Sequence, residues 1–381
     1  MMKLPFLLLI WVAAGVVLHA QEPATITIRK GDTTNIAVKS LGGADGAAAT
    51  KVIINDLGLS GLFQVGSPET ASFTASGQAG GGRLQGVVTD SRGSVVLEKT
   101  YQGDPRRAAH LFADDIVETI TGQKGIASTR IAFVANRTGR KEIYTADYDG
   151  ANVQQLTKDG SISVAPTLSA DGKRLAYTGY QSGYADIYLI DLQNGSRNRL
   201  VKFPGTNSGA AFSPDGSRIA CSVSRDGNPE LYVVSMGGGA RRLTRTRGVE
   251  SSPTWSPDGS EIIYSSDDSG GPQLYRIGSG GGAGKLISTG YRYCTEPSWS
   301  PDGTKVAFTA RTGGFSIAVK NLKTGATQVV ADGGEDPVWG ANSRHLIYST
   351  GSTLMLLDTQ SGRSVPIVSG LGKVSEPTWS R

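Results

Sequence analysis

Short apolar segments alternate with polar turns through the last two thirds of the chain, and one sequence motif, which we call the phrase, recurs there. Residues 253–265 read P-T-W-S-P-D-G-S-E-I-I-Y-S, and residues 297–309 read P-S-W-S-P-D-G-T-K-V-A-F-T. Each copy begins with a short strand that holds one large aromatic side chain. Pro-Asp-Gly then supplies the preset and positive φ angles of a tight turn, and an apolar, β-branched strand follows. The phrase therefore predicts a β-hairpin.

More divergent copies of the phrase set a long period. Its serine position is occupied in turn by Ser169, Ser213, Ser256, Ser300, Gly340 and Ser380. The spacings are 44, 43, 44, 40 and 40 residues. Two further strand-like segments lie between successive copies, for example residues 230–232 and 242–244. A period of about 40–45 residues with four strands per repeat is typical of the blades of a β-propeller.

The copies also predict how the ring closes. Six second strands, and hence six blades, are expected to begin at Ile131, Arg174, Arg218, Glu261, Lys305 and His345. The blade that opens at Ile131 has no inner strand before it, while the last copy, residues 377–380, has no strand after it. We expect this C-terminal strand to complete the first blade, because closure leaves no open sheet edge.

The first 20 residues predict a secretory signal. Lys3 precedes an apolar run over residues 4–18, and Ala20 stands before the expected cleavage point. The run is short for a membrane-spanning helix, so cleavage is favoured over an uncleaved anchor. The mature chain is then exported, soluble and not inserted in the membrane. The predicted division is a signal peptide over 1–20, a small α/β domain over 21–125 and an all-β six-bladed propeller over 126–381.

The N-terminal part of the mature chain carries no copy of the phrase and has helical and strand-like patterns instead. Apolar residues at helical spacing run over 105–121, where Pro105 favours a helix start and Gly122 a helix end. A weaker helical pattern covers residues 47–57. Residues 75–82 are rich in glycine and predict a mobile loop.

Charge and reactive side chains argue against nucleic-acid binding and catalysis. The net charge of +5 is spread along the chain without a basic block. His110 falls on the predicted helix, and His345 is expected to be solvated at a strand opening. The sequence has no zinc, calcium, phosphate-loop or nucleophile-elbow motif, so no cofactor or metal is expected. A propeller-associated serine peptidase stays as the enzymatic alternative. Cys221 and Cys294 fall on distant strands and predict two unpaired thiols.

The loops that precede the inner strands predict a binding site. In a propeller these loops meet at one mouth of the central channel, and four of the six carry acids. We predict an acidic funnel for a partner with basic or hydrogen-bond-donating loops, in which electrostatics speeds the encounter. In the alternative, some acids cap turns or pair with Arg292 and Arg344; a channel cation has no support from spacing. The predicted contact residues are Thr206, Asn207, Ser208, Gly209, Glu250, Ser251, Thr295, Glu296, Glu335, Asp336, Ser375 and Glu376.

The alternating segment Gln21–Lys30 is a second candidate for binding. A free terminus can add to a partner as a strand or fold back on its own domain. A frayed end or a simple first strand is the alternative. The predicted contact residues of this segment are Gln21, Glu22, Ala24 and Ile26.

The junction between the two parts carries the most specific likeness to known proteins. Residues 108–134 read A-A-H-L-F-A-D-D-I-V-E-T-I-T-G-Q-K-G-I-A-S-T-R-I-A-F-V, and A-D-Y-D-G follows at residues 146–150. In this order of helix, linker, strand and turn the chain resembles the TolB family. The resemblance covers nearly the whole mature chain, whereas many propellers share the P-x-W-S-P-D-G phrase alone.

The resemblance implies a non-enzymatic periplasmic protein of the Tol–Pal system, and a monomer is expected. It implies that a Pal-like peptidoglycan-associated lipoprotein binds at the propeller mouth and that a TolA-like inner-membrane protein meets the free N-terminal segment. Such a system helps to constrict the outer membrane at cell division, maintains envelope integrity and is exploited by colicins for import. The family's first domain is longer, so the short stretch over residues 61–82 predicts a trimmed one. A stand-alone periplasmic propeller with another ligand is the runner-up.

Overall fold

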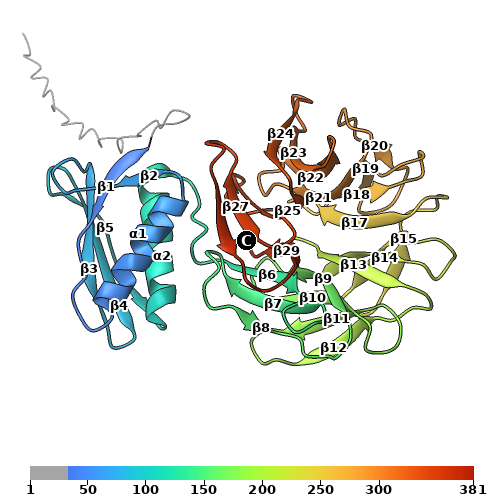
Figure 1. The fold of residues 1–381 in the computed structure, drawn as a ribbon, viewed down its shortest axis with the longest axis horizontal. Helices are drawn as coiled ribbons and strands as arrows, with labels where there is room; N and C mark the ends of the chain where they lie inside the picture. The colour runs from blue at the N-terminus through green and yellow to red at the C-terminus, as the bar shows by residue number, and fades with distance from the viewer. Residues whose placement is uncertain (1–32) are drawn as a thin grey trace, which may run out of the picture.

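The computed structural model describes residues 33–381, which form two parts side by side (Figure 1). The smaller, N-terminal part holds both helices, and the larger part is a ring of six four-stranded sheets. The predicted signal peptide and the predicted contact segment Gln21–Lys30 lie outside the described residues. Neither helix of the described chain combines the length and the apolar character needed to cross a membrane.

The N-terminal part is a five-stranded mixed sheet packed against two helices. Its elements are β1 (Thr34–Val38), α1 (Gly46–Leu59), β2 (Phe63–Val65), β3 (Phe73–Gly80), β4 (Arg83–Asp90), β5 (Val95–Gln102) and α2 (Pro105–Thr121). The strand order is β2-β1-β3-β4-β5, with β1 parallel to both of its neighbours and the rest antiparallel. The apolar sides of the helices form one core with the sheet, in which Ile53, Leu57 and Phe112 are fully buried.

The bounds of α2 confirm the helix predicted over residues 105–121. Pro105 is its first residue, and the side chain of Asp104 accepts a hydrogen bond from the backbone N–H of Arg107 at 2.9 Å. The helix ends at Gly122, whose φ of 67° is left-handed. Glycine adopts this conformation without the clash that a Cβ atom makes.

The prediction of a mobile loop over residues 75–82 is wrong. Most of this segment belongs to β3, which pairs along its whole length with β4. Glycines mark a close approach here. A Cβ atom on Gly77 would lie 2.1 Å from the carbonyl oxygen of Gln85, and one on Gly86 would lie 2.5 Å from the ring of Phe112. Glycine inside a strand can signal such close contact as well as flexibility.

The ring of six antiparallel sheets confirms the predicted propeller, and each sheet is one blade (Figure 1). Blades 1 to 3 contain β6 (Arg130–Ala135), β7 (Glu142–Asp147) and β8 (Gln154–Gln155); β9 (Ser163–Leu168), β10 (Arg174–Gly179), β11 (Asp186–Asp191) and β12 (Arg197–Val201); β13 (Asn207–Phe212), β14 (Arg218–Val223), β15 (Glu230–Ser235) and β16 (Ala240–Arg242). Blades 4 to 6 contain β17 (Glu250–Trp255), β18 (Glu261–Ser266), β19 (Gln273–Gly278) and β20 (Lys285–Leu286); β21 (Cys294–Trp299), β22 (Lys305–Arg311), β23 (Phe315–Asn321) and β24 (Thr327–Asp332); β25 (Glu335–Trp339), β26 (His345–Ser349), β27 (Leu354–Asp358) and β28 (Ser364–Val368). Cys221 in blade 3 and Cys294 in blade 5 are both buried and free.

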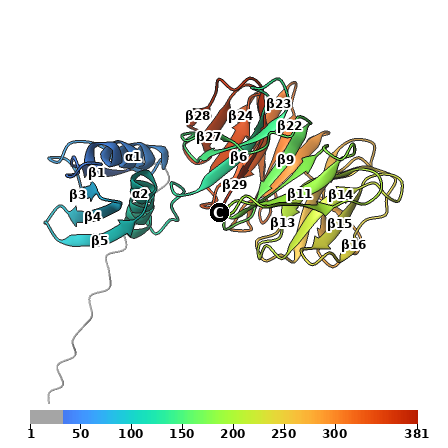
Figure 2. The ribbon, with the colours of Figure 1, turned by 90° about the horizontal axis from the view of Figure 1, so that it is seen from below.

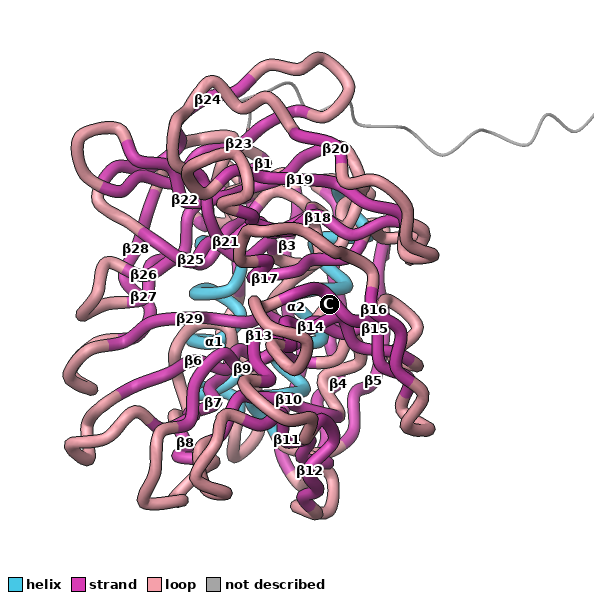
Figure 3. Tube along the Cα trace, turned by 90° about the vertical axis from the view of Figure 1, so that its right-hand side faces the viewer, coloured by secondary structure: helices cyan, strands magenta, loops and turns pink. Residues whose placement is uncertain are grey.

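The last strand, β29 (Val374–Trp379), closes the ring as the sequence predicts. It pairs with β6, with Trp379 opposite Ile131, and so becomes the inner strand of blade 1. The backbone N–H of Ser380 also donates to the carbonyl of Arg130 at 3.0 Å. Figure 3 shows the inner strands near the centre of the ring, with the two helices behind them. Pairing of the first and last strands removes the open edge.

The serine and aspartate of the phrase hold each turn together. In blade 4 the Ser256 hydroxyl donates to the Asp258 carboxylate at 2.6 Å and accepts from the backbone N–H of Glu261 at 2.9 Å. Cations also join neighbouring blades, because the guanidinium of Arg218 lies 4.9 Å from the ring centre of Trp255 in the next blade. The phrase therefore supplies both the turn and part of the contact between blades.

Blade 6 departs from the phrase, and its structure shows that the expectation of a solvated His345 is wrong. Gly340 stands at the serine position, where a Cβ atom would lie 2.8 Å from the ring of Trp379. Asn342 replaces the serine by accepting from the backbone N–H groups of Arg344 and His345, each at 3.1 Å. His345 is fully buried because its strand lies between β25 and β27. This burial lowers the pKa of His345 to about 4.

The linker between the two parts is fixed to the middle of α2. Residues 122–129 lead from α2 into β6, as Figure 2 shows. The carboxylate of Asp114 accepts from the backbone N–H groups of Ala127 and Ser128, at 2.7 and 2.9 Å. Ile126 and Ala127 are buried among residues of blade 1.

The two ends of the propeller have different neighbours. Strand pairing places the start of each inner strand beside the end of the second strand, as Ser163 lies beside Gly179. The opposite end of the propeller forms side-chain hydrogen bonds and ion pairs with the N-terminal domain. In one of them, Arg344 of the propeller donates to the carbonyl of Gly61 at 2.8 Å. The connections at the first end, which we call the mouth loops, are residues 136–141, 156–162, 180–185, 202–206, 224–229, 243–249, 267–272, 287–293, 312–314, 333–334, 350–353 and 369–373.

Candidate functional site

A cavity of about 570 Å³ lies within the ring of inner strands and reaches the mouth loops. Each inner strand has a β-bulge that carries its backbone into the left-handed region, with φ between 49° and 61°. The six bulge residues line the cavity, and we call them the channel ring: Ala165, Gly209, Ser252, Glu296, Asp336 and Glu376. Three adjacent blades, 5, 6 and 1, therefore place a carboxylate at the same level of the channel.

The backbone at the channel ring is strained wherever the residue has a side chain. A left-handed conformation costs such a residue roughly 1–2 kcal/mol. Gly209 avoids this cost, but Glu296, Asp336 and Glu376 do not. The surrounding sheets hold the backbone of these three residues in the left-handed conformation. Backbone strain of this kind is often found at functional positions. The channel ring is therefore the first candidate for a binding site.

The ring carboxylates also join each blade to the next. Glu296 accepts from the backbone N–H of Asp336 at 3.1 Å, and Asp336 accepts from the N–H of Glu376 at 2.8 Å. Glu376 in turn accepts from the N–H of Ala165 at 2.5 Å. These bonds occupy one oxygen of each side chain. The predicted alternative is that some acids cap turns; these three instead accept from backbone N–H groups of the neighbouring blade.

The crowding of carboxylates changes the ionisation of the ring. Burial and the charge of Glu296 raise the pKa of Asp336 well above its usual range. The pKa of Glu335, which lies beside the ring, is also raised by burial and by the charge of Glu296. A cation that enters the mouth would favour loss of the proton on Asp336, because an opposite charge stabilises a carboxylate.

Half of the twelve predicted mouth residues line the cavity, namely Gly209, Glu296, Glu335, Asp336, Ser375 and Glu376. Ser208, Ser251 and Thr295 are half-buried on the inner strands beside them, and Thr206 is exposed in a mouth loop. The suggested pairing of the acids with Arg344 is wrong, because that guanidinium binds Asp358 at 2.6 Å.

Two predicted residues, Asn207 and Glu250, do not face the channel. Both are fully buried. The Asn207 amide donates to the carbonyl of Phe203 at 2.8 Å, and Glu250 accepts from the hydroxyls of Thr246 and Ser266 at 2.7 and 2.8 Å. They occupy the first position of an inner strand, whereas the channel ring occupies the third position, or the second in the shorter strand β25. In most repeats the residue after the bulge is a proline. If the repeats are aligned on this residue, the first strand position separates from the bulge position, and this signal could have removed Asn207 and Glu250 from the predicted contact residues.

Two basic residues outside the prediction also line the cavity. Lys141 belongs to a mouth loop, and its Nζ lies 3.9 Å from a carboxylate oxygen of Glu376. Arg381 lies toward the opposite end, where its backbone N–H donates to Ala170 at 2.9 Å and its guanidinium donates to the carbonyl of Trp299 at 3.2 Å. Neither residue stands within a copy of the phrase, so the repeat does not mark them.

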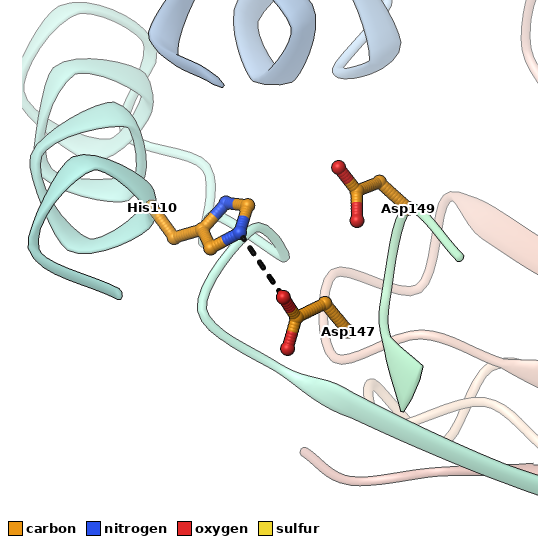
Figure 4. Close-up of side chains that lie close together, drawn as sticks. All are labelled: His110, Asp147 and Asp149. Atoms are coloured by element: carbon orange, nitrogen blue, oxygen red, sulfur yellow. Dashed lines mark ion pairs between the residues drawn. The ribbon is translucent and has the colours of Figure 1, made fainter. Parts of the chain in front are cut away.

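A second cluster of charged groups joins the two parts of the molecule (Figure 4). His110 on α2 lies 2.7 Å from Asp56 through Nδ1 and 3.9 Å from Asp147 through Nε2. Burial opposes a charge on His110, but its contacts with Asp147 and Asp56 raise its pKa to about 9. His110, Asp147 and Asp149 offer three ligand atoms within 4.8 Å of one another. Arg106 already pairs with both of these aspartates, so we interpret the cluster as an ionic joint rather than a metal centre.

The chain is similar in sequence to known proteins of one family. A model of the TolB beta propeller domain matches residues 117–381. The protein TolB homolog of Chlorobaculum tepidum is 44% identical over 119 residues, which are 30% of this chain and 27% of that protein. The Tol-Pal system protein TolB of Geobacter sulfurreducens is 36% identical over 168 residues, 35% of this chain and 39% of that protein. The matched segments thus span well under half of these relatives' length.

A solved structure extends the likeness to nearly the whole chain. The crystal structure of TolB from Acinetobacter baumannii matches with a TM-score of 0.83 and 25% identity, over 92% of this chain and 97% of that one. The propeller alone is a smaller share of the chain than the match covers, so the match includes the N-terminal part as well. Together with the six-bladed ring and its C-terminal closing strand, these findings show that the chain belongs to the TolB family.

Proposed function

We propose that this chain is a non-enzymatic periplasmic protein of the Tol–Pal system whose propeller mouth binds a Pal-like peptidoglycan-associated lipoprotein. The observation that carries the proposal is the channel ring, where Glu296, Asp336 and Glu376 sit at strained backbone positions in an open cavity. Relatives of this chain carry the name of the Tol-Pal system. The mouth is the end to which the N-terminal domain makes no side-chain hydrogen bond or ion pair among the described residues, and a partner can therefore reach it.

The lining of the cavity supports binding rather than catalysis. Neither His110 nor His345 lines the cavity in the described chain. The ring acids each hold a backbone N–H of the next blade, so they are committed to the wall of the channel. A rigid acidic wall suits a cationic or hydrogen-bond-donating loop of a partner protein.

The second contact of the proposal involves the N-terminal segment. A TolA-like inner-membrane protein would bind Gln21–Lys30, with Gln21, Glu22, Ala24 and Ile26 as contacts. Export through a cleaved signal peptide would deliver the chain to the periplasm as a monomer. Binding of both partners would support outer-membrane constriction at division and envelope integrity. Deletion of residues 21–28 should abolish capture of the TolA-like protein, and unchanged capture would remove this contact from the proposal.

The test of the mouth is calorimetry with the soluble domain of the Pal-like lipoprotein from the same organism. The triple variant Glu296→Gln, Asp336→Asn and Glu376→Gln removes the charges but keeps a side-chain carbonyl oxygen for each backbone N–H. We expect it to bind about tenfold or more weakly while its circular dichroism spectrum stays unchanged.

The matched control is Glu250→Gln, which neutralises a predicted mouth acid that does not face the channel. This variant should bind like the unmodified protein. No binding by the unmodified protein would reject the lipoprotein as the partner. Equal affinity of all three proteins would keep the partner and move its site away from the channel ring.

A further inference from the structure

The two ends of the propeller differ in charge as well as in shape. The mouth loops carry ten exposed Lys and Arg residues and three exposed carboxylates. The turns at the opposite end carry three exposed cations, Lys173, Lys323 and Arg363, and four exposed carboxylates, Asp171, Asp215, Asp258 and Asp302. The positive charge of the propeller is therefore concentrated at the mouth, although the channel inside the mouth is acidic.

Most of the cations are displaced around the mouth from the ring acids, and the two sets overlap at blade 1, where Lys141 pairs with Glu376. Eight of the ten exposed cations lie in the loops between β6 and β17, which belong to blades 1 to 4. The ring acids belong to blades 5, 6 and 1, and the loops at residues 312–314, 333–334 and 350–353 of blades 5 and 6 have no charged residue. The mouth thus has a mainly positive side over blades 2 to 4, which also holds the exposed Asp226, Asp267 and Asp268, and an acidic side over blades 5 and 6; the two sides meet at blade 1.

The positive side also exposes apolar surface. Tyr184 is 72% exposed, Tyr180 is 40% exposed, and Ile162 in the neighbouring loop is 47% exposed. Within the described chain, the cations of the mouth loops make only two ion pairs, Lys141 with Glu376 and Arg225 with Asp226. We call the set Lys158, Tyr180, Tyr184, Lys202, Arg245 and Arg247 the rim patch. Cations without an ion-pair partner and exposed aromatic side chains at the same end of a propeller are typical of a binding surface.

We propose that the rim patch binds an acidic protein segment that carries apolar side chains. This inference rests on the proposed function, because the segment belongs to the same partner whose basic or hydrogen-bond-donating tip enters the channel. Carboxylates of the segment would pair with Lys202, Arg245 and Arg247, and its apolar side chains would pack on the two tyrosines. A partner docked in the reverse direction would set like charges against each other, so the two sides of the mouth fix its orientation.

An anionic membrane surface would also attract the rim cations, but the structure favours a protein. The rim patch lies in the mouth loops, on the same face as the opening of a cavity of about 570 Å³ that other residues line; a flat bilayer leaves this cavity empty, whereas a protruding loop can fill it. The carboxylates of Glu296 and Glu376 would repel anionic headgroups that approach the centre of the same face. One partner with a basic tip and an acidic flank satisfies both sides of the mouth.

The test compares two variants with the same change in charge. Arg245→Glu with Arg247→Glu reverses two rim charges, and Lys173→Glu with Lys323→Glu reverses two charges at the opposite end. Surface-bound lipoprotein domain is exposed to each protein at several salt concentrations. We expect the rim variant to associate about tenfold more slowly at low salt and to lose most of the salt dependence, while the opposite-end variant matches the unmodified protein.

The apolar half of the patch is tested with Tyr180→Ser and Tyr184→Ser, which should speed dissociation and leave the association rate nearly unchanged. Equal rates for the rim and opposite-end variants would overturn the inference and leave the proposed function standing. No binding by the unmodified protein would overturn both. Loss of sedimentation with phosphatidylglycerol vesicles, together with unchanged lipoprotein binding, would assign the rim patch to a membrane and also overturn the inference.

Discussion

The two ends of the propeller are built from the same strands but use their connections differently. At the end nearer the N-terminal domain, the turns repeat a serine and an aspartate that bind each other, as in Ser213 with Asp215 and Ser256 with Asp258. At the mouth, the connections vary from two to seven residues and carry exposed cations and tyrosines. Repetition thus identifies the residues that hold the fold, and departures from it identify the surface that a partner can contact.

The carboxylates at the two ends show the same difference. Hydrogen bonds from serine hydroxyls lower the pKa of Asp215 and of Asp258 to about 2. These exposed groups are stable anions within their own turns. At the channel ring, burial and the charge of Glu296 raise the pKa of Asp336 instead. The charge of a turn carboxylate is already stabilised by hydrogen bonds in its own turn. The charges of the crowded ring carboxylates would be stabilised by an approaching cation.

The largest effect on stability should come from the buried ion pair near the N-terminal domain. Arg344 and Asp358 are 6% and 5% exposed, and the guanidinium also donates to Gly61 of the N-terminal domain. Asp358→Ala leaves a buried charge without its partner, which costs about 3–5 kcal/mol in free energy of unfolding. Urea denaturation measures this loss, and the folded fraction should still bind the lipoprotein domain.

An exposed ion pair is the control for Asp358→Ala. Glu261 and Arg276 lie 3.4 Å apart with about two fifths of each side chain exposed. Glu261→Ala should cost less than about 1 kcal/mol, because solvent already screens this pair. If Asp358→Ala costs no more than Glu261→Ala, the buried ion pair between Arg344 and Asp358 does not stabilise the end near the N-terminal domain.

The next effect concerns Glu250, which is buried at the mouth end beside Glu230. Burial and the charge of Glu230 raise the pKa of Glu250 from 4.5 to about 7. The folded protein therefore holds this proton more tightly than the unfolded chain does. Its contribution to stability is complete below about pH 4.5 and is lost as the pH rises to about 7, by at most about 3 kcal/mol.

Glu250→Gln should remove this part of the pH dependence. Thermal unfolding of both proteins across the range from about pH 4 to 8 gives the comparison. We expect the variant to gain stability relative to the unmodified protein as the pH rises. Two parallel profiles would show that Glu250 does not titrate in this range.

The smallest of these effects should come from one turn of the repeat. Ser256 is buried, donates to Asp258 and accepts from the backbone N–H of Glu261. Ser256→Ala leaves that N–H without its partner, so we expect a loss of about 1–2 kcal/mol. Lipoprotein binding should not change, because the turn lies at the end away from the mouth. A change in affinity without a change in stability would contradict the division between the two ends.

The repeat carried most of the fold prediction. The spacing of the phrase predicted six blades and the closing contact of residues 377–380 with the strand at Ile131, and the structure confirms both. Local signals also predicted α2, because Pro105 and Gly122 act through the backbone of the helix ends alone. These features depend on short-range geometry or on strict repetition, which a single sequence displays directly.

The errors come from contacts between segments that are distant in the sequence. Gly77 and Gly86 look like loop residues until Gln85 and Phe112 are seen against them. The surroundings of His345 depend on its place between two neighbouring strands. Acid content alone selected both Glu250 and Glu376 for the mouth, and only their positions within the inner strand show which one faces the channel. The domain bounds and the partner contacts stay predictions.

Hydrogen–deuterium exchange with and without the Pal-like lipoprotein domain tests directly whether the mouth is the binding surface. We expect protection of residues 156–162, 180–185 and 243–249 at the mouth, together with the inner strands that carry Glu296 and Glu376. The turns over residues 169–173, 213–217 and 256–260 should not change. Protection of those turns instead, with the mouth loops unchanged, would contradict the claim that the mouth is the binding surface.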